Sequence, residues 1–147
     1  MSADEQAELL AEERVVVCTS NGVHGWPHSM PLWFVVRGGE IWAWTYRSSQ
    51  KVRNLERDRR ATLLVEAGEQ YHELRGIQVE AEAEIIGDTE RVLDLARELT
   101  LRYAGGGESL PEDAEEALRR QAPKRVALRF EPQRTVSWDH RKLGGTY

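Results

Sequence analysis

The segment 47–55 combines residue types that together bind phosphate or another anion. Two serines, Ser48 and Ser49, stand directly before a predicted short helix that contains Lys51 and Arg53. Hydroxyl groups, the unpaired N–H groups of a helix start and two cationic side chains all favour a bound anion at such a place. Two acidic residues follow closely and partly neutralise the cations, so a merely solvated basic helix is the alternative interpretation.

A second candidate site lies in two neighbouring aromatic segments, 26–34 and 42–46. Pro27 and Pro31 lack the N–H of a strand ladder, so part of the first segment must form a sheet edge or a distorted strand. Backbone groups of such a strand are free to bind a ligand, and a flat ring fits against it. Ordinary packing of aromatic side chains in the core is the alternative.

The histidines do not form a recognisable metal site. His24 and His28 are four residues apart, but Gly25 and Pro27 between them exclude a shared helical face. Haem ligation remains a possible role for His24, His28, His72 and His140. The sequence lacks a Ser-His-Asp order, a CxxC pair and a glycine-rich dinucleotide motif, so we assign no catalytic side chain and no metal ligand.

Length and composition limit the number of domains and the kinds of partner that the chain can have. A chain of 147 residues fits one domain with a real core, and we expect a single domain over 1–147. The net charge of −5, from 25 acids against 20 bases, disfavours a nucleic-acid partner. The chain has neither an apolar run of ~18 residues nor a secretion signal, so we expect a cytoplasmic protein without a membrane segment. The single cysteine, Cys18, lies in an apolar run and is predicted to be a core thiol.

Alternating and helical patterns predict a mainly β protein with inserted helices. Strands are expected at 14–19, 28–36, 40–46, 61–66, 71–86 and from 126 onward; helices are expected at 2–13, within 47–60, from 88 to about 104 and from 109 to 122. This order favours an antiparallel Greek-key sheet that closes on itself over repeated βαβ units.

Three motifs occur in the order typical of one family. They are Pro27-x-x-x-Pro31-Leu32-Trp33-Phe34, then Gly39-Glu40-Ile41-Trp42, then Ser49-x-Lys51-Val52-Arg53-Asn54-Leu55-x-x-Asp58-x-Arg60. Together they resemble the pyridoxamine-5′-phosphate-oxidase-like split-barrel flavoproteins, and more narrowly the small actinobacterial members assigned to the deazaflavin cofactor F420. The closing segment 136–142 is also similar to the C-terminus of that subgroup.

The resemblance implies a split β-barrel homodimer with two cofactor sites at the subunit interface. It implies F420 as the cofactor, with FMN as the alternative. The cofactor phosphate maps onto Ser48, Ser49, Gln50, Lys51 and Arg53. Many FMN-binding relatives have arginine where this chain has Gln50, which speaks against a strict FMN oxidase.

The same resemblance maps the flat cofactor ring onto the second strand and its neighbour. The residues are Ser29, Met30, Pro31 and Leu32, with Thr45 on the adjoining strand. Near the C-terminus, His140 either reaches a cofactor across the dimer or closes the tail. Trp138 either stacks near a ring or anchors the core.

These features predict an oxidoreductase that transfers a hydride between reduced F420 and a small organic acceptor. An FMN-dependent oxidoreductase and a non-catalytic module that binds a cofactor or tetrapyrrole are the alternatives. Dimerisation also has a physical motive, because five tryptophans and four tyrosines are more aromatic surface than a small barrel readily hides.

Overall fold

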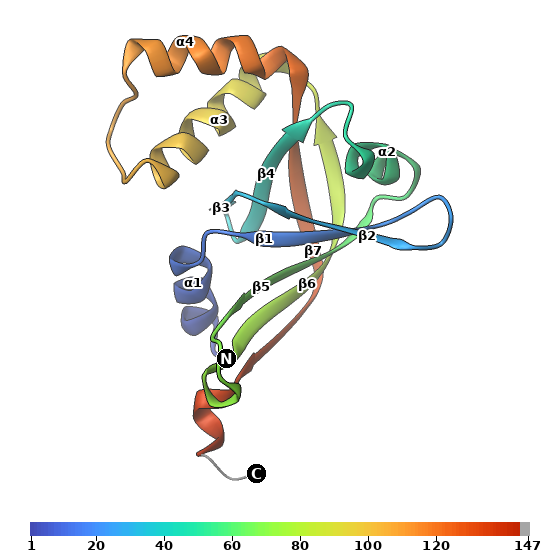
Figure 1. Ribbon diagram of the computed structural model, residues 1–147, viewed down its shortest axis with the longest axis vertical. Coiled ribbons are helices and arrows are strands. Elements are labelled where there is room, and N and C mark those ends of the chain that lie inside the picture. Colours follow the sequence, from blue (N-terminus) through green and yellow to red (C-terminus); the bar gives the residue numbers. More distant parts are fainter. Residues whose placement is uncertain (145–147) are drawn as a thin grey trace.

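The computed structural model describes residues 1–144 and consists of strands with inserted helices (Figure 1). The helices are α1 (Ala3–Glu12), α2 (Gln50–Arg57), α3 (Thr89–Tyr103) and α4 (Glu112–Gln121), with short 3₁₀ helices η1 (Tyr71–Glu73), η2 (Ala122–Lys124) and η3 (His140–Leu143). The strands are β1 (Val16–Asn21), β2 (Pro27–Leu32), β3 (Phe34–Arg37), β4 (Glu40–Tyr46), β5 (Arg60–Ala67), β6 (Arg75–Ile86) and β7 (Arg125–Asp139).

The seven strands form one antiparallel sheet in the order β2-β1-β5-β6-β7-β4-β3. The two edge strands, β2 and β3, are consecutive in the chain and are separated only by Trp33. Leu32 pairs with Val16 at one edge, and Phe34 pairs with Ala43 at the other. The chain therefore passes from one sheet edge to the other at Trp33, and we call this region the seam. This topology confirms the predicted split-barrel fold.

The inward side chains of the curled sheet form the main hydrophobic core. Helix α1 contributes Leu9 to this core, and α2 contributes Val52 and Leu55. The two helices lie at opposite ends of the barrel (Figure 1). We call these the α1 end, which also holds the N-terminus and η3, and the α2 end.

A second core cluster lies outside the barrel, under α3. It joins the apolar stripe of α3 to Val35 of β3, Ile86 of β6 and Ala127 of β7. Helix α4 lies over α3 (Figure 1), and Arg97 of α3 pairs with Glu115 of α4. In contrast, the outward residues Val17 of β1 and Leu64 of β5 are half-buried and belong to neither cluster.

Several details of the sequence prediction are confirmed. The helices expected at 2–13 and from 88 are both present. Ser2 and Glu5 form a capping box at the start of α1, and Asp88 caps α3 by accepting a hydrogen bond from the backbone N–H of Arg91. The last strand continues past Pro132, where the pairing of β6 with β7 contains an irregularity. Cys18 is buried in the core, and burial raises the pKa of its thiol to about 11.

The predicted extended run 28–36 is wrong as one strand, because the chain changes sheet edge at Trp33 and divides the run into β2 and β3. The first strand also begins later than expected, at Val16. Among the described residues, no helix is long and apolar enough to cross a membrane.

Candidate functional site

A cleft of about 320 Å³ lies at the seam, between β2, β4 and α3. Its walls are apolar and aromatic, with two hydroxyl groups and one cation. The lining residues are Pro31, Leu32, Trp33, Trp44, Thr45, Leu99, Thr100 and Arg125. An apolar cleft with a few polar groups is the usual composition of a small-molecule site.

Three of the predicted site residues, Pro31, Leu32 and Thr45, line this cleft together. Thr45 also connects it to a fourth, because the Lys51 ammonium donates a hydrogen bond of 3.0 Å to the Thr45 hydroxyl. The structure thus joins the aromatic strand to the start of α2, two segments that sequence analysis treated as separate candidates.

Lys51 is buried, with only 7% of its surface exposed. Burial lowers the pKa of its ammonium group, because a charge is less stable away from water. Among the described residues no carboxylate pairs with it, and Thr45 supplies its one hydrogen bond. The α2 end therefore contains a buried positive charge without a counter-ion, which is costly unless an anion compensates it.

Polar atoms around the start of α2 also lack partners. The Ser49 side chain stands at the N-cap position but makes no capping hydrogen bond. Its hydroxyl and the Nδ1 atom of His28 are both buried without a hydrogen-bond partner in the described part of the chain. Buried polar groups are rarely left unpaired, and each costs about 1–3 kcal/mol if it is. The unpaired hydroxyl of Ser49, two residues before Lys51, fits a bound anionic group better than it fits a closed core.

Neighbouring polar side chains of α2 are engaged within the protein. Asn54 is fully buried, donates to the Ser20 hydroxyl at 3.1 Å and accepts from Gln50 at 2.9 Å. Gln50 is therefore tied to its own helix. Arg57 donates to the backbone carbonyl of Asn21 at 2.7 Å and so fastens α2 to the β1–β2 turn.

The remaining predicted residues do not line the cleft. The hydroxyl of Ser29 lies 2.7 Å from that of Thr19, beside β1. Met30, Ser48 and Arg53 are exposed.

Arg125 was not predicted, Trp44 was considered only as part of its aromatic segment, and core packing was the expectation for Trp33 taken singly, which is 55% exposed instead. The Arg125 guanidinium lies 4.2 Å from the ring centre of Trp44 and 4.0 Å from that of Tyr46. The β4–β7 register explains this position, because it sets Tyr46 opposite Arg125. The alternation in 42–46 could place the two aromatic rings on one face, but no sequence signal identified β7 as the partner strand.

Trp33 forms the wall at the seam itself. Its ring stacks on Tyr103 of α3 at 4.3 Å with an interplanar angle of 9°, and the side chain is 55% exposed. The Tyr103 hydroxyl accepts a hydrogen bond from the backbone N–H of Phe34 at 2.9 Å. One face of Trp33 is thus fixed from behind, and the exposed remainder borders the cleft.

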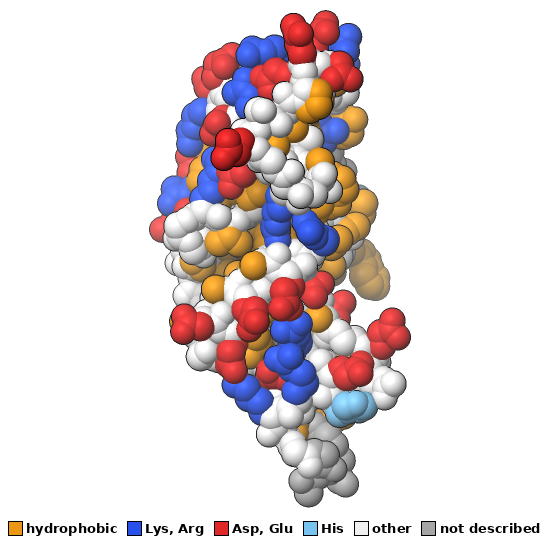
Figure 2. Space-filling model, turned by 90° about the vertical axis from the view of Figure 1, so that its left-hand side faces the viewer, with side chains coloured by type: hydrophobic (Ala, Val, Ile, Leu, Met, Phe, Trp, Pro, Cys, Tyr) orange, Lys and Arg blue, Asp and Glu red, His pale blue; other side chains and the backbone are white. Residues whose placement is uncertain are grey.

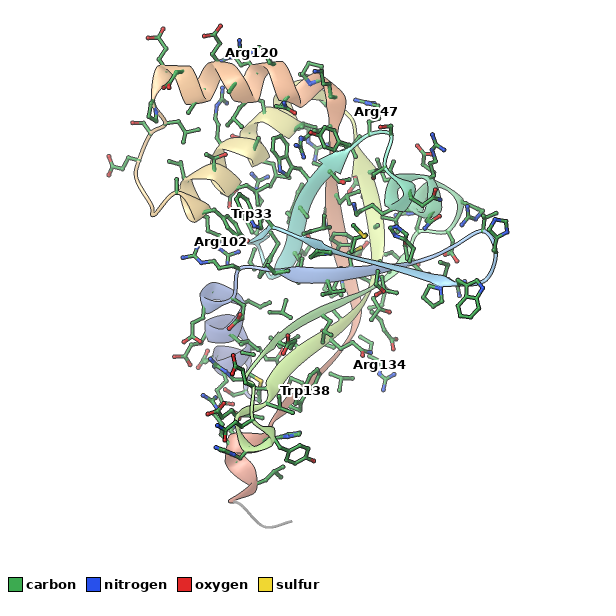
Figure 3. The ribbon with its side chains drawn as sticks, in the orientation of Figure 1. Trp33, Arg47, Arg102, Arg120, Arg134 and Trp138 are labelled. Atoms are coloured by element: carbon green, nitrogen blue, oxygen red, sulfur yellow. The ribbon has the colours of Figure 1, made fainter. Side chains whose placement is uncertain are left out.

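The C-terminal candidates lie toward the other end, as the positions of Trp33 and Trp138 illustrate (Figure 3). The Nδ1 atom of His140 lies 2.9 Å from the backbone carbonyl oxygen of Tyr71, and its backbone N–H donates to Leu74. Trp138 packs so closely over Gly76 that a side chain there would lie 2.2 Å from its ring. Both contacts join β7 and η3 to the rest of the protein. Within residues 1–144, histidine, cysteine and acidic side chains form no cluster suited to a metal.

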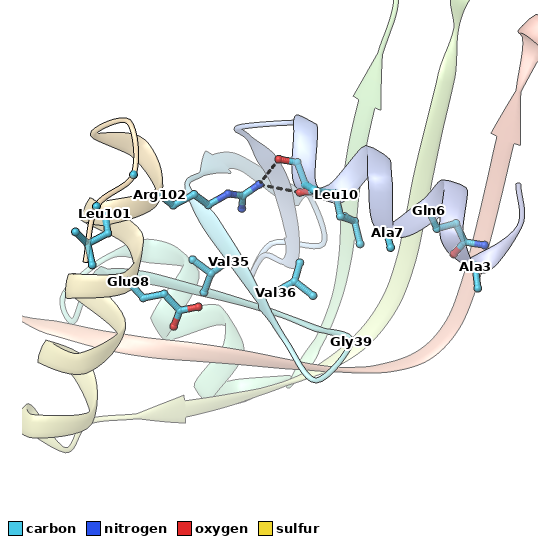
Figure 4. A pocket seen from close by; sticks show the side chains of 13 residues that line it. Ala3, Gln6, Ala7, Leu10, Val35, Val36, Gly39, Glu98, Leu101 and Arg102 are labelled. Atoms are coloured by element: carbon cyan, nitrogen blue, oxygen red, sulfur yellow. Dashed lines mark hydrogen bonds between the residues drawn. The ribbon is translucent and has the colours of Figure 1, made fainter. Parts of the chain in front are cut away.

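A larger hollow of about 770 Å³ lies between α1, β3 and α3 (Figure 4). Its one arginine, Arg102, donates hydrogen bonds to the backbone carbonyls of Leu10, Ala11, Glu13 and Phe34. This cation is therefore used to hold α1 and β3 together. The space-filling view of this side shows acidic and basic side chains interspersed (Figure 2). The hollow is large, but its arginine is already engaged and is not available to bind a ligand.

The sequence profile of the pyridoxamine 5′-phosphate oxidase family matches residues 2–139. The conserved hypothetical protein Rv2991 from Mycobacterium tuberculosis is 36% identical, with a TM-score of 0.89 over 100% of this chain and 90% of that chain. No functionally curated protein matches the sequence.

Two further solved structures share the fold at lower identity. A protein named F420 reductase is 21% identical, with a TM-score of 0.66 over 88% of this chain and 94% of that one. The heme storage protein HutZ from Vibrio cholerae is 16% identical, with a TM-score of 0.71 over 91% of this chain and 92% of that one.

Proposed function

The chain belongs to the pyridoxamine 5′-phosphate oxidase family, and from this premise we propose that it is an oxidoreductase that uses F420. It transfers a hydride between reduced F420 and a small organic acceptor, and we expect it to act in the cytoplasm. The observation that carries this proposal is the buried Lys51 ammonium, which has a hydroxyl partner in Thr45 but no counter-ion within the described chain. An anionic cofactor would supply that counter-ion.

The residues of the α2 end suit the anionic part of such a cofactor. Lys51 would neutralise its charge, and the unpartnered Ser49 hydroxyl would donate a hydrogen bond to it. Ser48 and Arg53 are exposed beside this turn and would contact the same group from the solvent side. We propose these four residues, with Gln50 orienting Asn54, as the phosphate site.

The seam suits the flat part of the cofactor. Pro31 and Leu32 offer an apolar surface, and Thr45 joins that surface to the charged group through Lys51. We propose that the ring lies along β2, in contact with Ser29 and Met30 at its outer side. When bound, F420 supplies the hydride, and the protein contributes position and exclusion of water.

We also propose that two copies form a homodimer with the cofactor sites at their interface. The half-buried Val17 and Leu64 lie outside both core clusters, and Trp26 at the β1–β2 turn is 80% exposed. Apolar surface of this kind is stabilised by burial against a second copy. A dimer is expected by light scattering, and a monomer at micromolar concentration would contradict it.

FMN-dependent redox chemistry would use the same anion site and flat surface. A non-catalytic module for haem or another tetrapyrrole is the second candidate function. The buried, unpartnered Nδ1 atom of His28 favours it, and so does the shared fold with HutZ. A binding module would hold its ligand without turnover.

A cofactor panel separates these possibilities. Purified protein is titrated with F420, FMN, FAD and haem, and each complex is then tested for turnover with electron acceptors. We expect saturable F420 binding that Lys51→Ala weakens about ten- to a hundredfold, the effect of losing a charge-assisted contact. Lys142→Ala, at the α1 end, is the matched control and should bind normally. Absence of F420 and FMN binding at high micromolar concentration would refute the proposal.

A further inference from the structure

Arg125 is a cation held between two aromatic rings at the cleft. Its guanidinium lies over Trp44 and Tyr46, and its Nε atom is buried without a hydrogen-bond partner. Within the described chain, no acidic side chain pairs with it. Aromatic faces fix the plane of a guanidinium but leave its N–H groups free to donate in that plane. Arg125 is therefore positioned to donate to a ligand.

Arg125 and Lys51 lie on opposite faces of β4. Thr45, the partner of Lys51, is buried and lies opposite Val126 of the core. Trp44 and Tyr46 are its neighbours on β4, so their side chains point the other way, toward Arg125. The two cations thus serve different binding positions, and the position at Arg125 is separate from the proposed phosphate site.

The other groups around Arg125 favour a flat apolar ligand. Leu32, Leu99 and the exposed part of Trp33 contribute apolar and aromatic surface. The hydroxyl groups of the cleft are already engaged, because Thr45 accepts from Lys51 and Thr100 donates to the carbonyl of Ala96 at 2.8 Å. Arg125 is then the main polar group left to recognise a ligand.

We propose that the Arg125 side of this cleft, next to the position proposed for the cofactor ring at Pro31 and Leu32, binds a flat, conjugated carboxylate. Arg125 holds the carboxylate, and the apolar body lies between Trp33, Trp44 and Leu99. Carboxylate and guanidinium match each other in geometry through two parallel hydrogen bonds. The role of such a molecule as hydride acceptor rests on the proposed function. Its binding at Arg125 is independent of that function.

The test uses 2-naphthoate and its neutral isostere 2-naphthamide, added to the cofactor-free protein at neutral pH. Binding is followed by quenching of tryptophan fluorescence and confirmed by calorimetry. We expect 2-naphthoate to bind at least tenfold more tightly than 2-naphthamide. Arg125→Gln should abolish this preference, and Arg125→Lys should keep part of it. Arg120→Gln, on the exposed side of α4 (Figure 3), is the matched control and should retain wild-type binding.

Equal binding of the two probes by the wild-type protein, or binding of neither, would overturn the inference. So would an Arg125→Gln variant that keeps the preference for 2-naphthoate. If Arg125→Gln does not fold, the comparison of 2-naphthoate with 2-naphthamide in the wild-type protein and in Arg125→Lys still tests the inference. The outcome is independent of the cofactor panel: naphthoate binding can depend on Arg125 while F420 fails to bind, and the reverse result refutes only the present inference.

Discussion

The two ends of the barrel differ in how completely their polar groups are paired. At the α1 end, Lys142 pairs with Glu5 at 2.7 Å and Arg75 pairs with Glu12 at 2.6 Å. Arg141 pairs with Asp139 at 2.7 Å and holds the pKa of that carboxyl at about 2. Most of these pairs connect segments far apart in the sequence. The ion pairs of this end therefore stabilise the fold by joining distant segments of the chain.

The α2 end, together with the cleft that adjoins it, has the opposite character. Among residues 1–144, Lys51 is buried without a counter-ion, and Ser49 and His28 carry unpartnered polar atoms. Arg125 contacts the rings of Trp44 and Tyr46 and forms no ion pair within that range. Stability alone does not account for such an arrangement, since each of these groups costs free energy in the absence of a partner. The contrast indicates that the α1 end contributes stability and the α2 end contributes binding.

The largest expected effect is a loss of stability at the α1 end. Leu9 is fully buried in the main core, so Leu9→Ala should lower the free energy of unfolding by about 2–5 kcal/mol. Urea denaturation measures this change. Below the transition, affinity for the cofactor and for 2-naphthoate should stay within twofold of wild type. A parallel loss of affinity would show that the two ends are not separable.

A smaller loss of stability is expected where Trp138 covers Gly76. A side chain at residue 76 would lie 2.2 Å from the Trp138 ring, so Gly76→Ala should cost about 1–3 kcal/mol through overpacking. Thermal unfolding measures it. Adding Trp138→Leu should recover part of the loss, because the smaller side chain makes room. If Trp138 contacted the cofactor instead, the double variant would lose affinity, and this result would contradict an anchoring role.

At the α2 end the expected effect on stability has the opposite sign. Lys51→Met replaces a buried, uncompensated charge with an apolar side chain of similar length. The free energy of unfolding should therefore stay unchanged or rise by about 1 kcal/mol, although cofactor affinity falls about ten- to a hundredfold. Denaturation without cofactor tests the sign. A decrease of more than 1 kcal/mol would mean that Lys51 supports the fold, as the polar groups of the α1 end do.

The fold was largely predictable because its signals are local. The capping box at Ser2, the alternation in β6 and the cap at Asp88 each depend on residues close in sequence. The split of β2 from β3 at Trp33 was missed, because the two halves pair with strands at different sheet edges. No local sequence pattern predicts that the chain changes its partner strand at this residue.

The site was predictable only in part for the same reason. The motif around Lys51 identified a cationic turn, but a motif cannot show that the ammonium is buried against Thr45. Arg125 is the first residue of the distant strand β7, and only the β4–β7 register places it beside Trp44 and Tyr46. Residues assembled by long-range pairing leave no signal in the spacing of any one segment.

The smallest expected effect is a pH dependence that belongs to Lys51 alone. Because burial lowers its pKa below the ordinary 10.5, the folded protein releases this proton before the unfolded chain does. Between the lowered pKa and 10.5 the unfolded state binds more protons, so the contribution of Lys51 to stability becomes more favourable as pH rises. Cofactor affinity should change in the opposite direction and fall over the same window, since the neutral amine no longer attracts an anion.

The ratio of wild-type to Lys51→Met affinity isolates this effect, because titration of the cofactor itself cancels in the ratio. We expect the ratio to fall toward one as the pH rises through the lowered pKa of Lys51 toward 10.5. Lys51→Arg should keep its affinity over that range if the guanidinium is accommodated, because arginine stays charged. The Arg125-dependent preference for 2-naphthoate should not change with pH there. A constant ratio up to pH 10.5 would mean that Lys51 contacts the cofactor without its charge, and the assignment of the anion site at the α2 end would fail.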